Sequence, residues 1–293
     1  MRVTDLFNRG EFVITTEVGP PKGFHIEHML EEAVTYLKDR VTAVNVTDNQ
    51  SSVMRLGSLA TCKALLDKGL TPICQLTCRD RNRIALQTEI LSAAMFGIEN
   101  LLLLTGDHTM LGDHPQAKPV FDLDSVSLIH AVKCLEAGAD IAGNALVGEP
   151  PKFAKGAVVS PCSDSLDAQL AKMEAKVRAG AEYFQTQAVF EPEKFIRFME
   201  KAKQFGVPVM LGVIIPKNAR MAKFMNDNVA GITVPQDMLD ELNKDPEKTK
   251  SGAAGVEITA RIIKECKAYC QGLHIMALGW ESKVPALLDQ AGL

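Results

Sequence analysis

Short runs of apolar residues alternate along the chain with longer segments in which apolar positions recur every three or four residues. The first pair is the run Glu11–Gly19, which predicts a strand, and the segment His25–Lys38, whose apolar positions follow helical spacing. Such alternation is typical of βα units around a parallel sheet. The pattern predicts strands at Glu11–Gly19, Thr42–Thr47, Thr71–Thr77, Glu99–Thr105, Asp140–Val147, Glu182–Gln187, Val207–Ile215 and Leu273–Leu278.

A predicted helix accompanies each strand. Several of these helices end on glycine, the residue that most easily takes the left-handed conformation of a helix C-cap. The stretch Pro235–Gly252 is predicted as an insertion with a small extra helix and a polar loop. The predicted helices are His25–Lys38, Met54–Lys68, Arg83–Phe96, Ser125–Glu136, Ser165–Ala179, Pro192–Gln204, Ala219–Met225, Ala253–Tyr269 and Trp280–Gln290.

Eight near-continuous apolar strands indicate a parallel sheet that is covered on both faces. Eight parallel strands also suffice to close a barrel, and 293 residues is a reasonable length for one such domain. We therefore expect an α/β fold, a (β/α)8 TIM barrel, with residues 1–293 as a single domain. An open, doubly wound sheet is the alternative, but no GxGxxG follows the first strand.

Composition narrows the class of protein further. Apolar residues make up 46% of the chain, the net charge is −4, and no block of like charge stands out, so neither nucleic acid nor membrane insertion is expected. The first residues lack a signal-peptide pattern, and we expect a cytoplasmic protein. The seven cysteines are scattered and odd in number, which disfavours a disulfide framework. Cys266 and Cys270 could share a helix face, but no nearby histidine completes a metal site, so no metal is predicted.

Polar residues follow the predicted strands at the end where barrel enzymes keep their active sites. Two carboxylates, Glu17 and Asp107, each close an apolar strand, the second in the stretch LLLLTGDHT. Apolar surroundings disfavour the ionised form of a carboxyl group and so suit a general acid. Both could instead cap helices or pair with Lys and Arg. The other polar strand-end residues include Thr47, Asp48, Gln75, Asn144 and Gln187.

Five motifs in register, TEVGPPKG, VTAVNVTDN, QLTCRD, LLLLTGD and EYFQTQAVF, give the chain a resemblance to the methylenetetrahydrofolate reductase family over residues 10–280. The resemblance implies a flavin-containing barrel that reduces 5,10-methylenetetrahydrofolate to 5-methyltetrahydrofolate by hydride transfer from flavin N5. It implies that Glu17 is the general acid that protonates folate N10. Asp107 would lie near flavin and pterin, and Gln187 would bind the pterin.

The resemblance also implies a set of cofactor-binding residues. Thr47 matches a threonine close to the flavin, and Lys176 matches a lysine that meets the flavin phosphate. The expected cofactor is FAD, with FMN as the alternative, because several positions depart from the family pattern. Gln75 stands in place of a histidine, Thr105 in place of an arginine, and Leu146 and Pro150 in place of an aromatic ring and an imidazole. The expected cofactor-binding residues are Thr47, Asp48, Gln75, Thr105, Gly106, Asp107, Asn144 and Lys176.

The chain is more similar to short bacterial forms of that family, including those of acetate-producing anaerobes, than to the animal enzymes. The resemblance implies electrons from NADH or NADPH, or from a partner subunit carrying zinc and iron–sulfur clusters, in a homo- or hetero-oligomer. Two alternatives stay open: a non-redox pterin-binding barrel of the folate methyltransferase type, and a catalytically silent assembly subunit. We also consider His108 as a flavin or substrate contact, His114 as a solvated loop residue, and Trp280 as a stacking or core residue.

Overall fold

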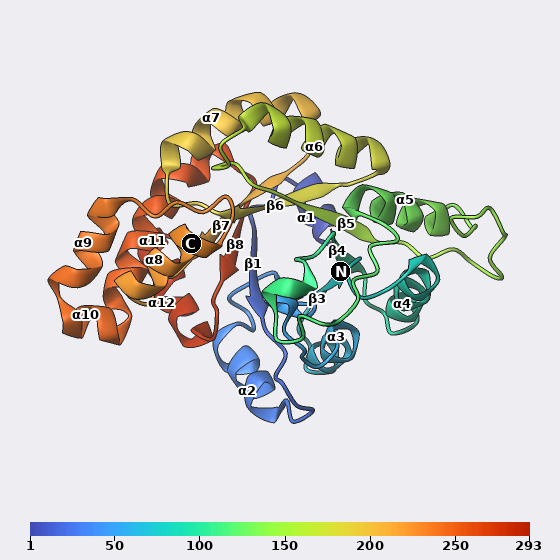
Figure 1. The fold of residues 1–293 in the computed structure, drawn as a ribbon, viewed down its shortest axis with the longest axis horizontal. Helices are drawn as coiled ribbons and strands as arrows, with labels where there is room; N and C mark the ends of the chain where they lie inside the picture. The colour runs from blue at the N-terminus through green and yellow to red at the C-terminus, as the bar shows by residue number, and fades with distance from the viewer.

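Eight parallel strands pair in chain order around a closed ring, and β8 returns to β1 (Figure 1). The computed structural model describes the whole chain, residues 1–293. The closed ring confirms the predicted (β/α)8 barrel and excludes the open sheet. The strands are β1 (Val13–Val18), β2 (Ala43–Val46), β3 (Pro72–Thr77), β4 (Asn100–Leu104), β5 (Ala154–Val159), β6 (Tyr183–Ala188), β7 (Val209–Ile214) and β8 (Gly272–Met276).

The helices form the outer layer and bury their apolar faces against the strands (Figure 1). Ser125–Glu136 forms a helix as predicted, with Asp124 as its cap, because the Asp124 carboxylate accepts the Ser127 N–H. The helices that match predictions are α2 (Glu27–Tyr36), α3 (Ser58–Asp67), α4 (Arg83–Met95), α5 (Ser125–Glu136), α6 (Leu166–Ala179), α7 (Pro192–Ala202), α8 (Ala219–Asn228), α11 (Ala253–Cys266) and α12 (Val284–Ala291). No helix is both long and apolar enough to cross a bilayer.

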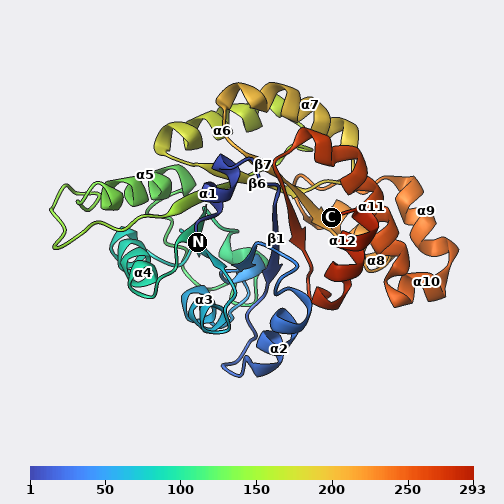
Figure 2. The same cartoon turned by 180° about the vertical axis from the view of Figure 1, so that it is seen from behind.

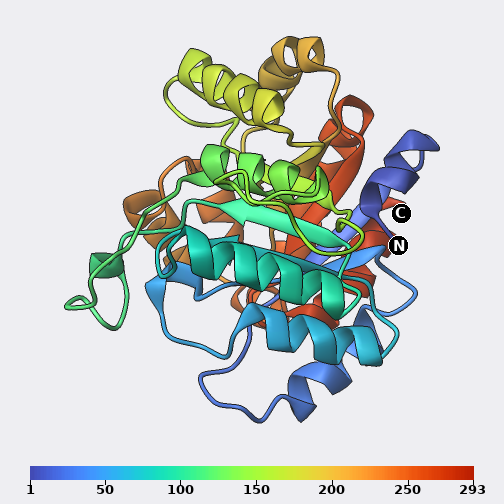
Figure 3. The same cartoon turned by 90° about the vertical axis from the view of Figure 1, so that its right-hand side faces the viewer.

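A short helix that the pattern did not predict, α1 (Val3–Asn8), closes the amino-terminal end of the barrel. Val3 and Leu6 are buried there against residues from the starts of the strands, among them Tyr183. The Val3 N–H donates to Asn100 Oδ1 at 2.8 Å. Figure 2 shows α1 across this end, and Figure 3 shows that the loop after β4 projects at the opposite end. A ligand must therefore enter from the carboxyl-terminal side.

The prediction of a fifth strand at 140–147 is wrong. These residues form an exposed hairpin between α5 and β5, at the amino-terminal side of the strands, and the strand itself is Ala154–Val159. The Asp140 side chain accepts the backbone N–H groups of Ala142 and Asn144, which holds a tight turn in which Gly143 has φ +92°. Turn chemistry therefore outweighed the apolar alternation of this segment. Asn144 therefore lies at the amino-terminal end of the barrel, away from the carboxyl-terminal rim where a cofactor is expected to bind.

The insertion at 235–252 is more regular than predicted. It contains two helices, α9 (Gln236–Lys244) and α10 (Pro246–Ser251), in place of one helix and a loop. Asp245 caps α10 by accepting the Lys248 N–H at 3.0 Å, and Pro246 occupies the first helical position, where its missing N–H costs nothing. Both helices lie outside the barrel beside α11 (Figure 1).

Candidate active site

A cavity of about 430 Å³ lies at the carboxyl-terminal ends of the strands, and we call it the rim cavity. Side chains far apart in the sequence reach it because parallel strands of a barrel all end at the same rim. Asn144 does not line the cavity, because it lies at the other end of the barrel. The predicted residues that do are Glu17, Thr47, Asp48, Gln75, Thr105, Gly106, Asp107, Lys176 and Gln187.

Glu17, near the end of β1, is buried, with 6% of its surface exposed. Its surroundings are more polar than its apolar sequence neighbours implied. Gln50 Nε2 donates to Glu17 Oε1 at 3.3 Å, and His274 Nε2 lies 3.8 Å from Glu17 Oε2. The carboxyl group therefore stands at the cavity wall with a nitrogen facing each of its oxygens.

Asp48, directly after β2, has a structural role that its sequence position did not reveal. Asp48 Oδ2 accepts the backbone N–H and the hydroxyl of Thr77, both at 2.8 Å, and pairs with Arg81. These bonds join the ends of β2 and β3. The neighbouring Thr47 hydroxyl is different: it is buried and has no hydrogen-bond partner in the protein. A buried hydroxyl without a partner at a cavity wall is a suitable contact for a ligand.

The end of β4 shows why glycine stands before Asp107. Gly106 has φ +91°, and a Cβ there would lie 3.0 Å from Thr77 Cβ. The preceding Thr105 Oγ1 accepts the Ser125 N–H at 3.0 Å and so anchors α5. The Asp107 side chain is exposed, in contrast to the buried acid that the apolar run suggested. Its carboxylate is therefore accessible to a ligand.

Arg79 joins the loops that follow β2 and β4. This side chain is 2% exposed, and its guanidinium donates to the carbonyl oxygens of Asn49 at 3.2 Å and Asp107 at 3.4 Å. Asp80 balances its charge at 2.7 Å. Because Asn49 has φ +47°, the first of these bonds holds a strained backbone segment at the cavity wall.

Gln187 faces the cavity from a bulge in β6. The pairing of β6 with β7 shifts between Gln185 and Ala188, and the Gly212 N–H donates to Thr186 Oγ1 at 2.8 Å. Such a bulge re-aims a side chain at the end of a strand. The Gln187 Oε1 accepts the Ala188 N–H at 3.0 Å, and its amide Nε2 is left for a ligand.

Lys176, on α6, supplies a cation to the part of the rim cavity wall next to β5. Its ammonium donates to the Val158 carbonyl at 2.7 Å. Burial and the nearby Lys172 lower the pKa of Lys176 to about 8. Lys176 is therefore mostly charged at neutral pH, and it loses that charge as the pH rises through about 8.

The sequence reasoning missed several residues of this site: Arg79, Ser160, Gln169, Lys172 and His274. Ser160 was missed because the fifth strand was misplaced, although the β-branched pair Val158-Val159 before it is a strand signal. The comparison of Leu146 and Pro150 with the family pattern was made at the wrong place for the same reason. Arg79 lies in the motif QLTCRD, but its role depends on distant backbone partners, and nothing in the local sequence marks His274.

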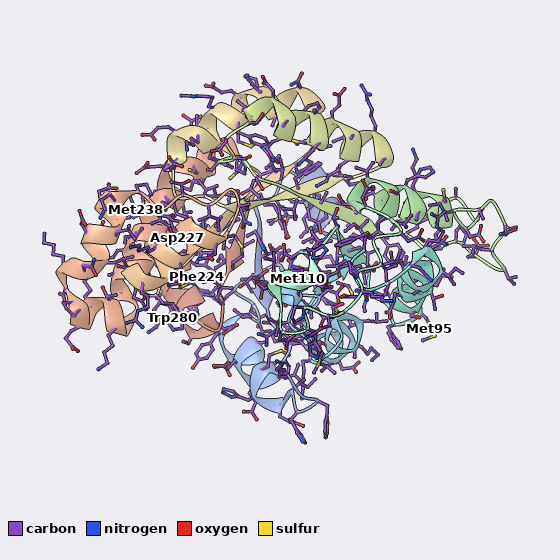
Figure 4. The ribbon with its side chains drawn as sticks, in the orientation of Figure 1. Met95, Met110, Phe224, Asp227, Met238 and Trp280 are labelled. Carbon is purple, nitrogen blue, oxygen red and sulfur yellow. The ribbon has the colours of Figure 1, made fainter.

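Three other residues considered from the sequence lie outside the cavity lining. His108 is exposed, accepts the Met110 N–H at 3.2 Å and stacks on Phe121. His114 is exposed beside Asp113. The Lys217 ammonium lies 5.2 Å from the ring centre of Trp280, which sits on the α8 side, away from Met110 (Figure 4).

The paired cysteines are buried thiols. Burial raises the pKa of Cys266 to about 12 and that of Cys270 to about 11, so both are protonated at neutral pH, whereas metal ions bind thiolates. The structure contains no group of three or more His, Cys, Asp or Glu side chains placed to hold a metal ion.

The family model described as methylenetetrahydrofolate reductase matches residues 2–292. Methylenetetrahydrofolate reductase 2 of Schizosaccharomyces pombe is 25% identical over the whole chain, which spans only 48% of that protein. The 5,10-methylenetetrahydrofolate reductase of Escherichia coli is 27% identical over 87% of this chain and 82% of its own. Among solved structures, an uncharacterized Clostridium thermocellum protein, described as binding two copies of 5-methyl-5,6,7,8-tetrahydrofolic acid, shares the fold with TM-score 0.65 and 16% identity. That match covers 99% of this chain and 96% of the other.

The bonds of Asp48 predict that it contributes to stability. Asp48→Asn removes the anion that pairs with Arg81, and we expect the free energy of unfolding to fall by about 2 kcal/mol, the range for hydrogen bonds to a charged group. Urea denaturation measures the change. Asp107→Asn is the matched control, since Asp107 is exposed at a nearby strand end, and it should change stability by less than about 0.5 kcal/mol. Equal effects of the two substitutions would contradict the assignment.

Proposed function

The chain belongs to the methylenetetrahydrofolate reductase family, and on this basis we propose that it reduces 5,10-methylenetetrahydrofolate to 5-methyltetrahydrofolate with a bound flavin. The observation that carries the proposal is that Glu17, Asp107 and Gln187, from three different strands, line one cavity. The Clostridium thermocellum neighbour, described as binding 5-methyl-5,6,7,8-tetrahydrofolic acid, supports a folate as the ligand of this fold.

The residues of the rim cavity fit a flavin. The buried Thr47 hydroxyl lacks a partner in the protein. Lys172 and Lys176, both on α6, place positive charge in the cavity wall, where a phosphate group would bind. Thr47, Gln75, Gly106 and Lys176 would hold the group. When bound, the flavin supplies the hydride that reduces the methylene carbon.

The protein residues carry the rest of the proposed chemistry. Glu17 donates a proton to N10 of the substrate, which opens the five-membered ring and exposes the methylene carbon. The accessible Asp107 carboxylate accepts hydrogen bonds from the pterin amino groups and stabilises developing positive charge. The amide Nε2 of Gln187, which has no partner in the protein, orients the pterin ring. General acid catalysis of this kind contributes roughly 10²- to 10⁴-fold to a rate.

The cofactor and its electron source are finer parts of the proposal. The segment that follows the true fifth strand is Ser160-Pro161-Cys162-Ser163-Asp164, which has neither the aromatic ring nor the imidazole of the family pattern. We propose FAD as the cofactor because of the family, and these two departures keep FMN as the alternative. We propose NADH, NADPH or a zinc and iron–sulfur partner subunit as the electron source, in a cytoplasmic homo- or hetero-oligomer.

The lowered pKa of Lys176 predicts that flavin binding depends on pH. Lys176 loses its positive charge as pH rises through about 8, so a phosphate-bearing flavin should bind about tenfold more weakly at pH 9 than at pH 7. Quenching of flavin fluorescence measures the affinity. Lys176→Met should bind weakly at both pH values. Protein that binds neither FAD nor FMN at any pH would contradict the reductase and favour one of the two flavin-free alternatives, the methyltransferase-type barrel or the silent subunit.

The role of Glu17 predicts a selective loss of activity. Glu17→Gln should lower the rate of methylenetetrahydrofolate reduction by roughly 10²- to 10⁴-fold, because an amide cannot donate the proton. Reduction of the flavin by its own electron donor should be unchanged. Stopped-flow absorbance follows the two half-reactions separately. If both were lost together, Glu17 would have a structural role instead.

A further inference from the structure

A chain of buried polar side chains crosses the inside of the barrel below Glu17. It consists of Thr15 on β1, Asn45 on β2, Gln185 on β6 and His274 on β8, each less than 5% exposed. Side chains inside a barrel are usually apolar. A polar group buried there costs free energy unless it is hydrogen-bonded, so the arrangement of these four needs an explanation.

Gln185 and Asn45 form a reciprocal pair of amide hydrogen bonds, and Gln185 also donates to Thr15. Gln185 Nε2 donates to Asn45 Oδ1 at 3.1 Å and to Thr15 Oγ1 at 3.2 Å, while Gln185 Oε1 accepts from Asn45 Nδ2 at 2.9 Å. The Thr15 hydroxyl therefore already accepts one bond. Its single proton is free to be donated to His274 Nδ1, which lies 2.9 Å away.

The direction of the bond between Thr15 and His274 determines which nitrogen of His274 carries the proton. If Nδ1 accepts from Thr15, a neutral imidazole must carry its proton on Nε2. The Nε2 atom lies 3.8 Å from Glu17 Oε2. The N–H group thus faces the carboxyl oxygen that Gln50 does not bind, because Gln50 donates to Oε1.

We propose that His274 is a positioning residue for Glu17, held as the Nε2–H form by Thr15, Gln185 and Asn45. The catalytic part of this inference rests on the proposed function, in which Glu17 gives up a proton and becomes a carboxylate. An N–H group fixed in advance beside Oε2 stabilises the negative charge as it develops. The separation of 3.8 Å exceeds a hydrogen bond, and it shortens as the charge forms.

The protonated nitrogen can be tested without any reaction. In ¹⁵N-labelled protein, long-range ¹H–¹⁵N correlation spectra distinguish the two neutral forms of each of the six histidines, and His274→Gln identifies the signal. We expect the Nε2–H form for His274 in the unmodified protein. Thr15→Val removes the hydroxyl at nearly the same volume, and the two forms should then mix. An Nδ1–H form, or a spectrum that Thr15→Val leaves unchanged, would overturn the proposal.

Kinetics test the consequence for Glu17. His274→Phe keeps a ring and removes the N–H, whereas the amide of His274→Gln places a donor near the position of Nε2. In the flavin-loaded enzyme we expect kcat for folate reduction to fall about tenfold in His274→Phe with KM unchanged, and less than about threefold in His274→Gln. Equal losses in both variants, or none in His274→Phe, would overturn the catalytic role. An unmodified enzyme that reduces no folate would refute the proposed function, while the spectra still decide whether His274 is held as described.

Discussion

Closure of the parallel ring is the constraint on which the site depends. The pairing of β1 with β8, with Thr15 opposite His274, forces all eight strands to end at one rim. Glu17, Asp107 and Gln187 are separated by long stretches of sequence, yet they line one cavity because each stands at or near the carboxyl end of its strand. Since α1 covers the other end, the rim is the side from which a ligand can reach these side chains.

The polar groups of the barrel divide into two kinds. Asp48 and Arg79 form hydrogen bonds within the protein. Asp48 joins β2 to β3, and Arg79 joins the loop after β2 to the loop after β4. Thr47 and Asp107 instead line the cavity, the first with a buried hydroxyl that has no partner in the protein and the second with an exposed side chain. This division explains how a rim with many charged residues can be rigid and still bind a polar ligand: the first set fixes the positions of the second.

The fold could be predicted well because most strands are compact apolar runs, and this pattern depends only on near neighbours. The strand prediction failed at 140–147. There an exposed hairpin contains enough apolar residues to resemble a strand, while Asp140 and Gly143 form a turn. Asn144 was assigned to the cofactor for that reason alone. The roles of His274 and Arg79 could not be predicted, because they depend on a partner on another strand and on partners in distant loops. His274 in particular is a single polar residue within an apolar run, which carries no local signal of its own.

In the proposed reaction, a flavin held in the rim cavity passes a hydride to a folate. The most direct test mixes the flavin-loaded protein, first reduced chemically under anaerobic conditions, with 5,10-methylenetetrahydrofolate in a single turnover. We expect the flavin to be reoxidised and an equal amount of 5-methyltetrahydrofolate to form. A flavin that stays reduced, with no 5-methyltetrahydrofolate produced, would contradict it.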